Sequence, residues 1–158
     1  MTKVKIVAIF SICAVFITVP GTGADFAARA DDLGSALYGG IIQLRQTCGV
    51  IGDDPALTKA AQRHADDMLV SGENGHIGSD GSSPQARIAD AGYTKAGYTG
   101  EIVYWGTGSH ATPSAALDLW MESPPHRDII MNCAFTKGGF ATASDGHKMT
   151  AVGDFAAP

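Results

Sequence analysis

The sequence lacks several features that would assign it to a common class of protein. Its formal net charge is −5, and an acidic surface repels nucleic acid. Its longest apolar run, residues 6–19, is shorter than the roughly 20 residues of a membrane-spanning helix. The His-x-x-x-His pair of helical zinc sites and the Gly-x-Ser-x-Gly turn of many esterases are both absent, as are internal repeats. What remains is a chain of single-domain size that can bury a core without a metal.

Residues 1–30 have the features of a secretory signal peptide. Two lysines precede the apolar run, and small residues follow it. We expect cleavage after Ala30 or Ala24 and a secreted or cell-envelope location, with an uncleaved N-terminal anchor as the alternative. Because residues 1–30 carry a net positive charge of two, cleavage after Ala30 would change the net charge from −5 to −7.

Cysteine is scarce, with three residues in the chain. Cys13 lies in the predicted signal peptide, which leaves Cys48 and Cys133 for the exported protein. An even pair outside the cell predicts one disulfide, and two free buried thiols are the alternative.

A capping residue precedes a proline or an apolar stripe at four positions, which predicts four helix starts. They are Asp31 or Asp32, Asp53 or Asp54 before Pro55, Ser83 before Pro84, and Thr112 before Pro113. Residues 49–55 are expected to form a turn, and residues 123–125 (Ser-Pro-Pro) to end the fourth helix.

The remaining segments predict strands. Residues 98–106 are β-branched and aromatic, and residues 135–143 and 148–155 are predicted to form a hairpin around Asp145-Gly146. Helices first and a hairpin last indicate an α+β fold with helices packed on an antiparallel sheet.

Three residues stand out as candidates for function. His76 and His126 lie in turn-rich stretches, with Glu101 about midway between them. Imidazole and carboxylate groups can bind a transition metal or transfer protons near neutral pH, and loops usually display such groups. We therefore expect any functional site to include this trio.

The other histidines outside the signal peptide have simpler interpretations. His64 shares the apolar stripe of the second predicted helix, so we expect it to be buried and hydrogen-bonded to backbone. His110 and His147 follow glycines in expected turns and should face solvent.

The chain contains a series of short motifs in this order: Leu57-x-x-Ala60-Ala61-x-x-His64-Ala65-x-Asp67-Met68, His76, Arg87-x-x-x-Ala91-Gly92-Tyr93, Gly100-Glu101, Trp120-Met121-x-Ser123-Pro124-x-His126-Arg127 and Asn132-Cys133-x-Phe135. Their order resembles that of bacterial proteins of the CAP family, also called SCP or sperm-coating-protein-like. The block that begins at Trp120 is the most specific. The resemblance covers residues 31–158, which would form one CAP domain.

The resemblance implies an α-β-α sandwich with a central antiparallel sheet between helices and a surface cleft. In the wider family two histidines and two glutamates line the cleft, and some members bind zinc or another divalent ion through the histidines. By position, His76, Glu101 and His126 match three of the four. Ser123 occupies the usual place of the second glutamate, and Glu122 lies one step away, so both are candidates for groups that support the ligating side chains.

These observations predict a secreted protein whose cleft binds a divalent metal such as Zn²⁺, or a small apolar or cell-envelope ligand, without established catalysis. The alternatives are a lipid or sterol carrier and a cell-wall-associated metal-dependent hydrolase. A serine hydrolase that uses Ser79, Ser82 or Ser123 is less favoured, because serines near glycines are usually loop residues. We expect a monomer that binds no nucleic acid and has no transmembrane span in the mature chain.

Overall fold

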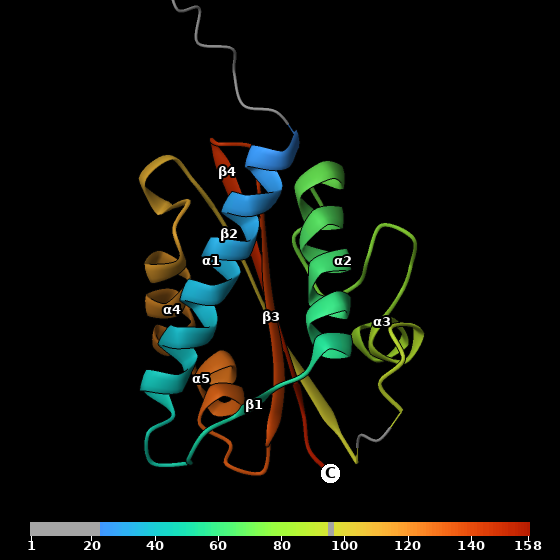
Figure 1. Cartoon of the computed structure of the whole chain (residues 1–158), viewed down its shortest axis with the longest axis vertical. Coiled ribbons are helices and arrows are strands. Elements are labelled where there is room, and N and C mark those ends of the chain that lie inside the picture. The colour runs from blue at the N-terminus through green and yellow to red at the C-terminus, as the bar shows by residue number, and fades with distance from the viewer. Residues whose placement is uncertain (1–22, 95–96) are drawn as a thin grey trace, which may run out of the picture.

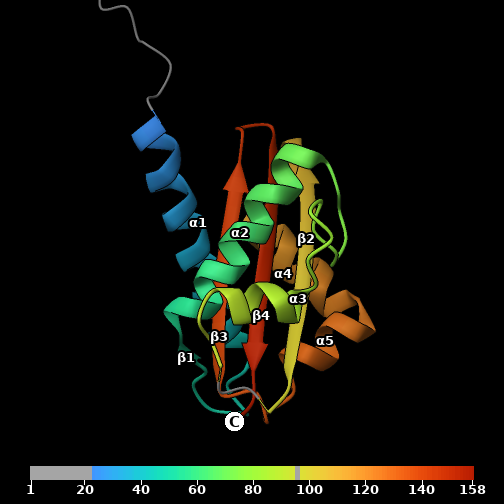
Figure 2. The same ribbon diagram turned by 90° about the vertical axis from the view of Figure 1, so that its right-hand side faces the viewer.

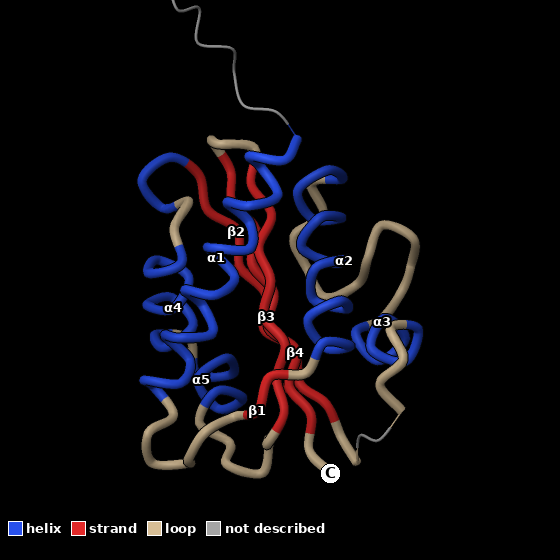
Figure 3. The backbone as a smooth tube through the Cα atoms, viewed as in Figure 1, coloured by secondary structure: helices blue, strands red, loops and turns tan. Residues whose placement is uncertain are grey.

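The computed structural model describes residues 23–94 and 97–158, which form a sheet between two layers of helices (Figure 1, Figure 3). The sheet order is β1-β3-β4-β2, and its strands are β1 (Gly52–Asp53), β2 (Thr99–Thr107), β3 (Lys137–Ser144) and β4 (Lys148–Ala156). One face carries α2 (Pro55–Ser71) and α3 (Pro84–Asp90), and the other carries α1 (Gly23–Leu44), α4 (Pro113–Glu122) and α5 (Pro124–Ile130). The predicted α-β-α sandwich of the α+β class is therefore confirmed.

The central strand β4 shows why helices cover both faces of the sheet. Successive strand side chains point to opposite faces. Val152 packs with Ala61 and Met68 of α2, whereas Met149 and Phe155 belong to the core beneath α1 and α4. Because both faces of the sheet are covered, every residue from Met149 to Ala156 is buried.

The helix starts marked by a proline are confirmed. Asp54 caps α2, where its carboxylate accepts hydrogen bonds from the backbone N–H groups of Ala56 and Leu57. Ser83 caps α3 and Thr112 caps α4 in the same way, each followed by proline at the first helical position. The predicted strand at residues 98–106 and the predicted hairpin correspond to β2 and to the antiparallel pair β3–β4.

Three local predictions are wrong. The first helix begins at Gly23 and not at Asp31 or Asp32. The expected turn at residues 49–55 contains β1, which pairs in parallel with Lys137 and Gly138 of β3 and makes the sheet mixed. The two prolines after Ser123 end α4 but also begin α5, so His126 lies on a helix.

The predicted signal peptide lies mostly outside the described residues. Of residues 1–30, the structure describes only 23–30, which form the start of α1. Within the described part of the chain, no helix combines the length and apolar character needed to cross a membrane. The signal peptide and its cleavage site therefore stay predictions.

The predicted disulfide between Cys48 and Cys133 is present, with 4.9 Å between the two Cα atoms. It joins the segment after α1 to the segment after α5. The buried guanidinium of Arg45 reinforces the same junction, since it donates to the carbonyl of Asn132 at 3.1 Å and to that of Phe135 at 2.6 Å. The ends of α1 and α5 are therefore fixed to each other both covalently and by hydrogen bonds.

Candidate functional site

Glu101 is the centre of the candidate site. It lies on β2, the outermost strand next to β4, and is 6% exposed. Its Oε1 lies 2.8 Å from Nδ1 of His76, and its Oε2 accepts a hydrogen bond from Nη2 of Arg87 at 2.6 Å. A buried carboxylate needs such partners, because desolvation penalises its charge. Glu101 therefore links the loop that carries His76 to α3.

His76 lies on the loop between α2 and α3, as predicted, and its side chain is 49% exposed. Buried side chains hold this loop from two helices. Arg87 of α3 donates to the His76 carbonyl at 3.0 Å and to the Ser82 carbonyl at 2.8 Å. On α2, Nε2 of His64 lies 2.8 Å from the Gly75 carbonyl. The loop is thus anchored on both sides of the exposed imidazole.

His64 itself matches the interpretation from sequence. It is fully buried and bonded to backbone. Burial lowers the pKa of its imidazole, and the hydrogen bond to Gly75 opposes that effect in part. The neutral ring is therefore a structural support for the loop.

His126 lies on α5, where Nδ1 is 2.9 Å from Oγ of Ser123. Ser123 stands at the junction of α4 and α5, so the pair spans the first turn of α5. Burial lowers the pKa of His126, and the proximity of His76 lowers it further. Glu122, the other candidate support, is exposed at the end of α4. The structure thus brings Ser123, not Glu122, to His126.

The two histidines are carried by helical layers on opposite faces of the sheet, and His126 lies close enough to His76 for the charge of His76 to lower the pKa of His126. The loop with His76 belongs to the layer of α2 and α3, whereas α5 belongs to the other layer (Figure 2). Among the described strands, β2 pairs with β4 alone and forms an edge of the sheet, where side chains from both layers can reach it. Trp120 of α4 donates from Nε1 to the Val103 carbonyl at 2.9 Å, which fixes the second layer to this strand. The site therefore forms where the sheet ends.

Few protein atoms at the site remain available to bind a ligand. Both oxygens of Glu101 are already in contact with His76 and Arg87. Both imidazoles use Nδ1, and within the described part of the chain no protein group bonds to Nε2 of either ring. Among the described residues, no three His, Cys, Asp or Glu side chains form a ready metal cage. A ligand would thus meet the Nε2 atoms of two imidazoles, with Glu101 behind the ring of His76 and Ser123 behind that of His126.

Two residues of this region were not predicted from the sequence. Arg87 appeared only as part of a family motif, with no role assigned. Asp154 of β4 was not considered at all, yet it is fully buried and paired in register with Glu101. Its place in a hydrophobic strand, between Gly153 and Phe155, was the available signal, because a charged residue is rarely fully buried without a reason.

The serines considered as nucleophiles are otherwise engaged. Ser79 bonds to Asp67 through both its hydroxyl and its backbone N–H. Ser82 lies against Arg87. Ser123 contacts Nδ1 of His126, whereas the serine of a catalytic triad contacts Nε2 and leaves Nδ1 for the group that orients the ring. His110 and His147 are exposed, as predicted.

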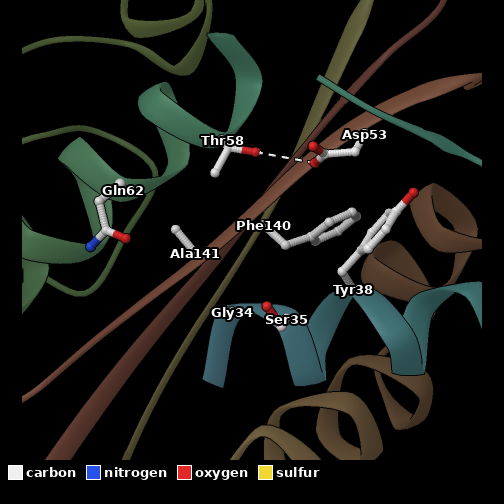
Figure 4. A pocket seen from close by; sticks show the side chains of 8 residues that line it. All are labelled: Gly34, Ser35, Tyr38, Asp53, Thr58, Gln62, Phe140 and Ala141. Carbon is white, nitrogen blue, oxygen red and sulfur yellow. Dashed lines mark hydrogen bonds between the residues drawn. The ribbon is translucent and has the colours of Figure 1, made fainter. Parts of the chain in front are cut away.

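A cavity of about 360 Å³ lies elsewhere, between α1 and α2 over β3 (Figure 4). Its lining combines aromatic, hydroxyl, amide and carboxylate groups from Gly34, Ser35, Tyr38, Asp53, Thr58, Gln62, Phe140 and Ala141. Apolar groups with a few polar ones are the usual lining of a small-molecule pocket, so this lining does not distinguish the lipid-carrier alternative from the binding of another small ligand.

Solved structures from bacteria share this fold. An outer surface protein of Borrelia burgdorferi is 22% identical, with a TM-score of 0.68 over 78% of this chain and 90% of that one. An extracellular protein with an SCP domain from Bacillus anthracis is 20% identical, with a TM-score of 0.71 over 89% of this chain. A cysteine-rich secretory protein of Staphylococcus aureus is 14% identical, with a TM-score of 0.61 over 82% of this chain.

This chain spans 45% of the Bacillus protein and 40% of the Staphylococcus protein, so those two are much longer. At these identities the structures show a shared fold and no more. No curated protein matches the chain. The model of the cysteine-rich secretory protein family, CAP, matches residues 53–155, which contain every residue of the candidate site. The chain therefore belongs to the CAP family.

Proposed function

We propose that this chain is an exported CAP protein that binds a divalent metal ion through Nε2 of His76 and Nε2 of His126. One observation carries the proposal: each ring contacts a partner through Nδ1, Glu101 for the first and Ser123 for the second. A ligating histidine almost always donates its other ring N–H to such a partner, which sets the tautomer and the ring orientation.

The residues fit a metal only in part, and this defines the kind of site. Imidazole nitrogens suit Zn²⁺, Cu²⁺ and Ni²⁺. Glu101 would orient His76 and balance charge without ligating, because both its oxygens are engaged. Two protein ligands are fewer than the three of a typical catalytic zinc site. We therefore propose binding, with solvent or a partner molecule completing the coordination, and no turnover.

The protonation state of His126 favours metal binding near neutral pH. A histidine must lose its proton before it can ligate. Because burial lowers the pKa of His126, that ring is neutral over a wider pH range than an ordinary histidine.

The proposal that the protein is exported rests on the predicted signal peptide, with the disulfide as a second argument. Disulfides persist mainly in oxidising compartments outside the cytosol. The similar proteins from Borrelia and Bacillus are described as outer-surface and extracellular, which agrees with this location.

Calorimetric titration with Zn²⁺ tests the metal proposal. We expect a saturable binding heat for the wild type that disappears when His76→Ala and His126→Ala are combined. The matched control combines His110→Ala and His147→Ala, which removes two exposed histidines and should leave the heat unchanged. Equal heats for the wild type and the His76/His126 double variant would contradict the proposal.

A further inference from the structure

Asp154 occupies the most enclosed position near the site. It lies on β4 between Gly139 of β3 and Glu101 of β2, and no part of it is exposed. A Cβ atom built on Gly139 would stand 2.0 Å from the backbone nitrogen of Thr58, so α2 lies directly on this part of the sheet. Water therefore has no open path to the carboxyl group from the side of β3.

Among the described residues no cation forms an ion pair with Asp154, although the charge of Arg87 acts on it. Arg87 of α3 gives its ion pair to Glu101, its other hydrogen bonds go to the carbonyls of His76 and Ser82 and to the Ser82 hydroxyl, and its Nε–H has no partner in the described part of the chain. His64 of α2 has a pKa lowered by burial and is neutral. Among the described residues no donor reaches either carboxyl oxygen of Asp154. An ionised carboxylate without a partner in such a place would be strongly destabilising.

The neighbouring carboxylate of Glu101 offers Asp154 a hydrogen-bond partner in place of a cation. Asp154 and Glu101 stand directly opposite each other on neighbouring strands, and two carboxyl groups can share a hydrogen bond only if one carries a proton. Burial is the largest influence on the pKa of Asp154 and raises it, the charge of Glu101 raises it further, and Arg87 opposes both. Glu101 already contacts Arg87 and His76, whereas neither oxygen of Asp154 has such a partner among the described residues, so the hydrogen of the pair is assigned to Asp154.

We propose that Asp154 is a protonated carboxylic acid that donates its hydrogen to Glu101 and so acts as a positioning residue for His76. Glu101 then accepts from three directions: Asp154 within the sheet, Arg87 of α3, and Nδ1–H of His76. Its orientation is fixed, and it holds His76 in the tautomer that leaves Nε2 free for a ligand. The use of this arrangement for metal binding rests on the proposed function, but the arrangement itself does not.

The tautomer of His76 is the direct readout. Asp154→Asn keeps a hydrogen-bond donor of the same shape, whereas Asp154→Ala removes it. We expect long-range ¹H–¹⁵N spectra of the imidazole rings to show His76 protonated at Nδ1 in the wild type and in Asp154→Asn, and to show a mixture of tautomers in Asp154→Ala. The His76 signals are assigned by their loss in His76→Gln. The same Nδ1 tautomer in all three proteins would overturn the proposal.

Infrared spectroscopy provides a second test that does not need the truncated variant to fold. At neutral pH the wild type should show the C=O stretch of a protonated carboxyl group, and Asp154→Asn should lack it. If the wild type and Asp154→Asn have the same spectrum in this region, Asp154 is ionised and the proposal is wrong.

Zinc titration of the same variants connects the inference to the proposed function. Loss of a group that orients a ligating histidine typically weakens metal affinity by about 10–100-fold. We expect that loss for Asp154→Ala and an affinity close to wild type for Asp154→Asn. If the wild type binds no zinc, the proposed function fails, while the tautomer and infrared results still decide the state of Asp154.

Discussion

The ion pair between Arg87 and Glu101 is the strongest residue-scale feature of the site. Both side chains are almost completely buried, and their closest atoms are 2.6 Å apart. Removing one partner of a buried pair leaves an uncompensated charge, which typically costs about 3–5 kcal/mol. We expect Arg87→Gln to destabilise the protein by that amount, measured by urea unfolding.

Arg63 is the matched control for this prediction. It also makes two short ion pairs, to Asp80 and Asp90, but all three side chains are exposed. Such surface pairs contribute little to stability. Arg63→Gln should leave the unfolding midpoint nearly unchanged, and an equal loss in both variants would show that burial is not what makes the Arg87 pair important.

The raised pKa of Asp154 predicts a specific pH dependence of stability. From the ordinary aspartate value of 3.8 up to the raised folded value, the native state holds one proton more than the unfolded chain. Stability should therefore fall as pH rises, by about 1.4 kcal/mol per pH unit. His64 and His126, whose pKa values are lowered, contribute with the opposite sign in their own range. Comparison with Asp154→Asn cancels these histidine contributions.

In urea unfolding, Asp154→Asn and the wild type should be most similar near pH 4. As the pH rises, the free energy of unfolding of Asp154→Asn should increasingly exceed that of the wild type, until the pH passes the pKa of Asp154 in the folded protein. A stability difference that stays constant between pH 4 and pH 9 would mean that Asp154 titrates normally.

At the residue scale, the sequence indicated the side chains that match a family motif and missed the buried groups that support them. His76 and Glu101 were identified because their residue types are chemically suggestive and their order matches a family motif. Arg87 and Asp154 depend on cross-strand register and on packing between α3 and the sheet. Neither relation can be read from local sequence.

At the scale of elements, the close approach of α2 to β3 depends on Gly139. A Cβ atom there would stand 2.0 Å from the nitrogen of Thr58 and 2.2 Å from the carbonyl carbon of Leu57, and neither is a flexible side-chain end. The helix and the strand would have to separate. We expect Gly139→Ala to cost about 3 kcal/mol or more, since overpacking against backbone cannot be relieved by a rotamer change.

Gly39→Ala is the contrasting substitution. Gly39 lies inside α1, and nothing stands within 4 Å of a Cβ built on it. Alanine in a helix loses less backbone entropy on folding, so this variant should gain about 0.5–1 kcal/mol. Thermal unfolding of both variants would test the pair, and the argument fails if Gly139→Ala is as stable as the wild type.

The elements themselves were predictable where their signals are local. Asp54 with Pro55 and Thr112 with Pro113 mark helix starts by capping and by the fixed φ of proline, which need no tertiary contact. β1 was missed because two residues form a strand only when β3 is beside them. α5 was missed because two prolines that end one helix can also begin the next.

At the scale of the whole molecule, the order of motifs was more informative than any single element. It implied the α-β-α sandwich before the strand pairing was known, and the family match over residues 53–155 agrees with it. The disulfide was predicted by a different argument, since two cysteines in a chain expected to be exported usually pair with each other. Together they place α5, and with it His126, against the rest of the fold.

Reducing this disulfide should lower global stability without dissolving the native fold. The cysteines are 85 residues apart in sequence, and in the chain-entropy model closing such a loop stabilises by at most about 4–5 kcal/mol. Arg45 still links the same segments through backbone carbonyls, so the native contacts should persist at low denaturant.

We expect a reductant to lower the urea midpoint of the wild type while leaving its circular dichroism unchanged before unfolding. The variant with Cys48→Ser and Cys133→Ser should have the midpoint of the reduced wild type and no further response to reductant. An unchanged wild-type midpoint under full reduction would show that the loop is already restricted in the unfolded chain.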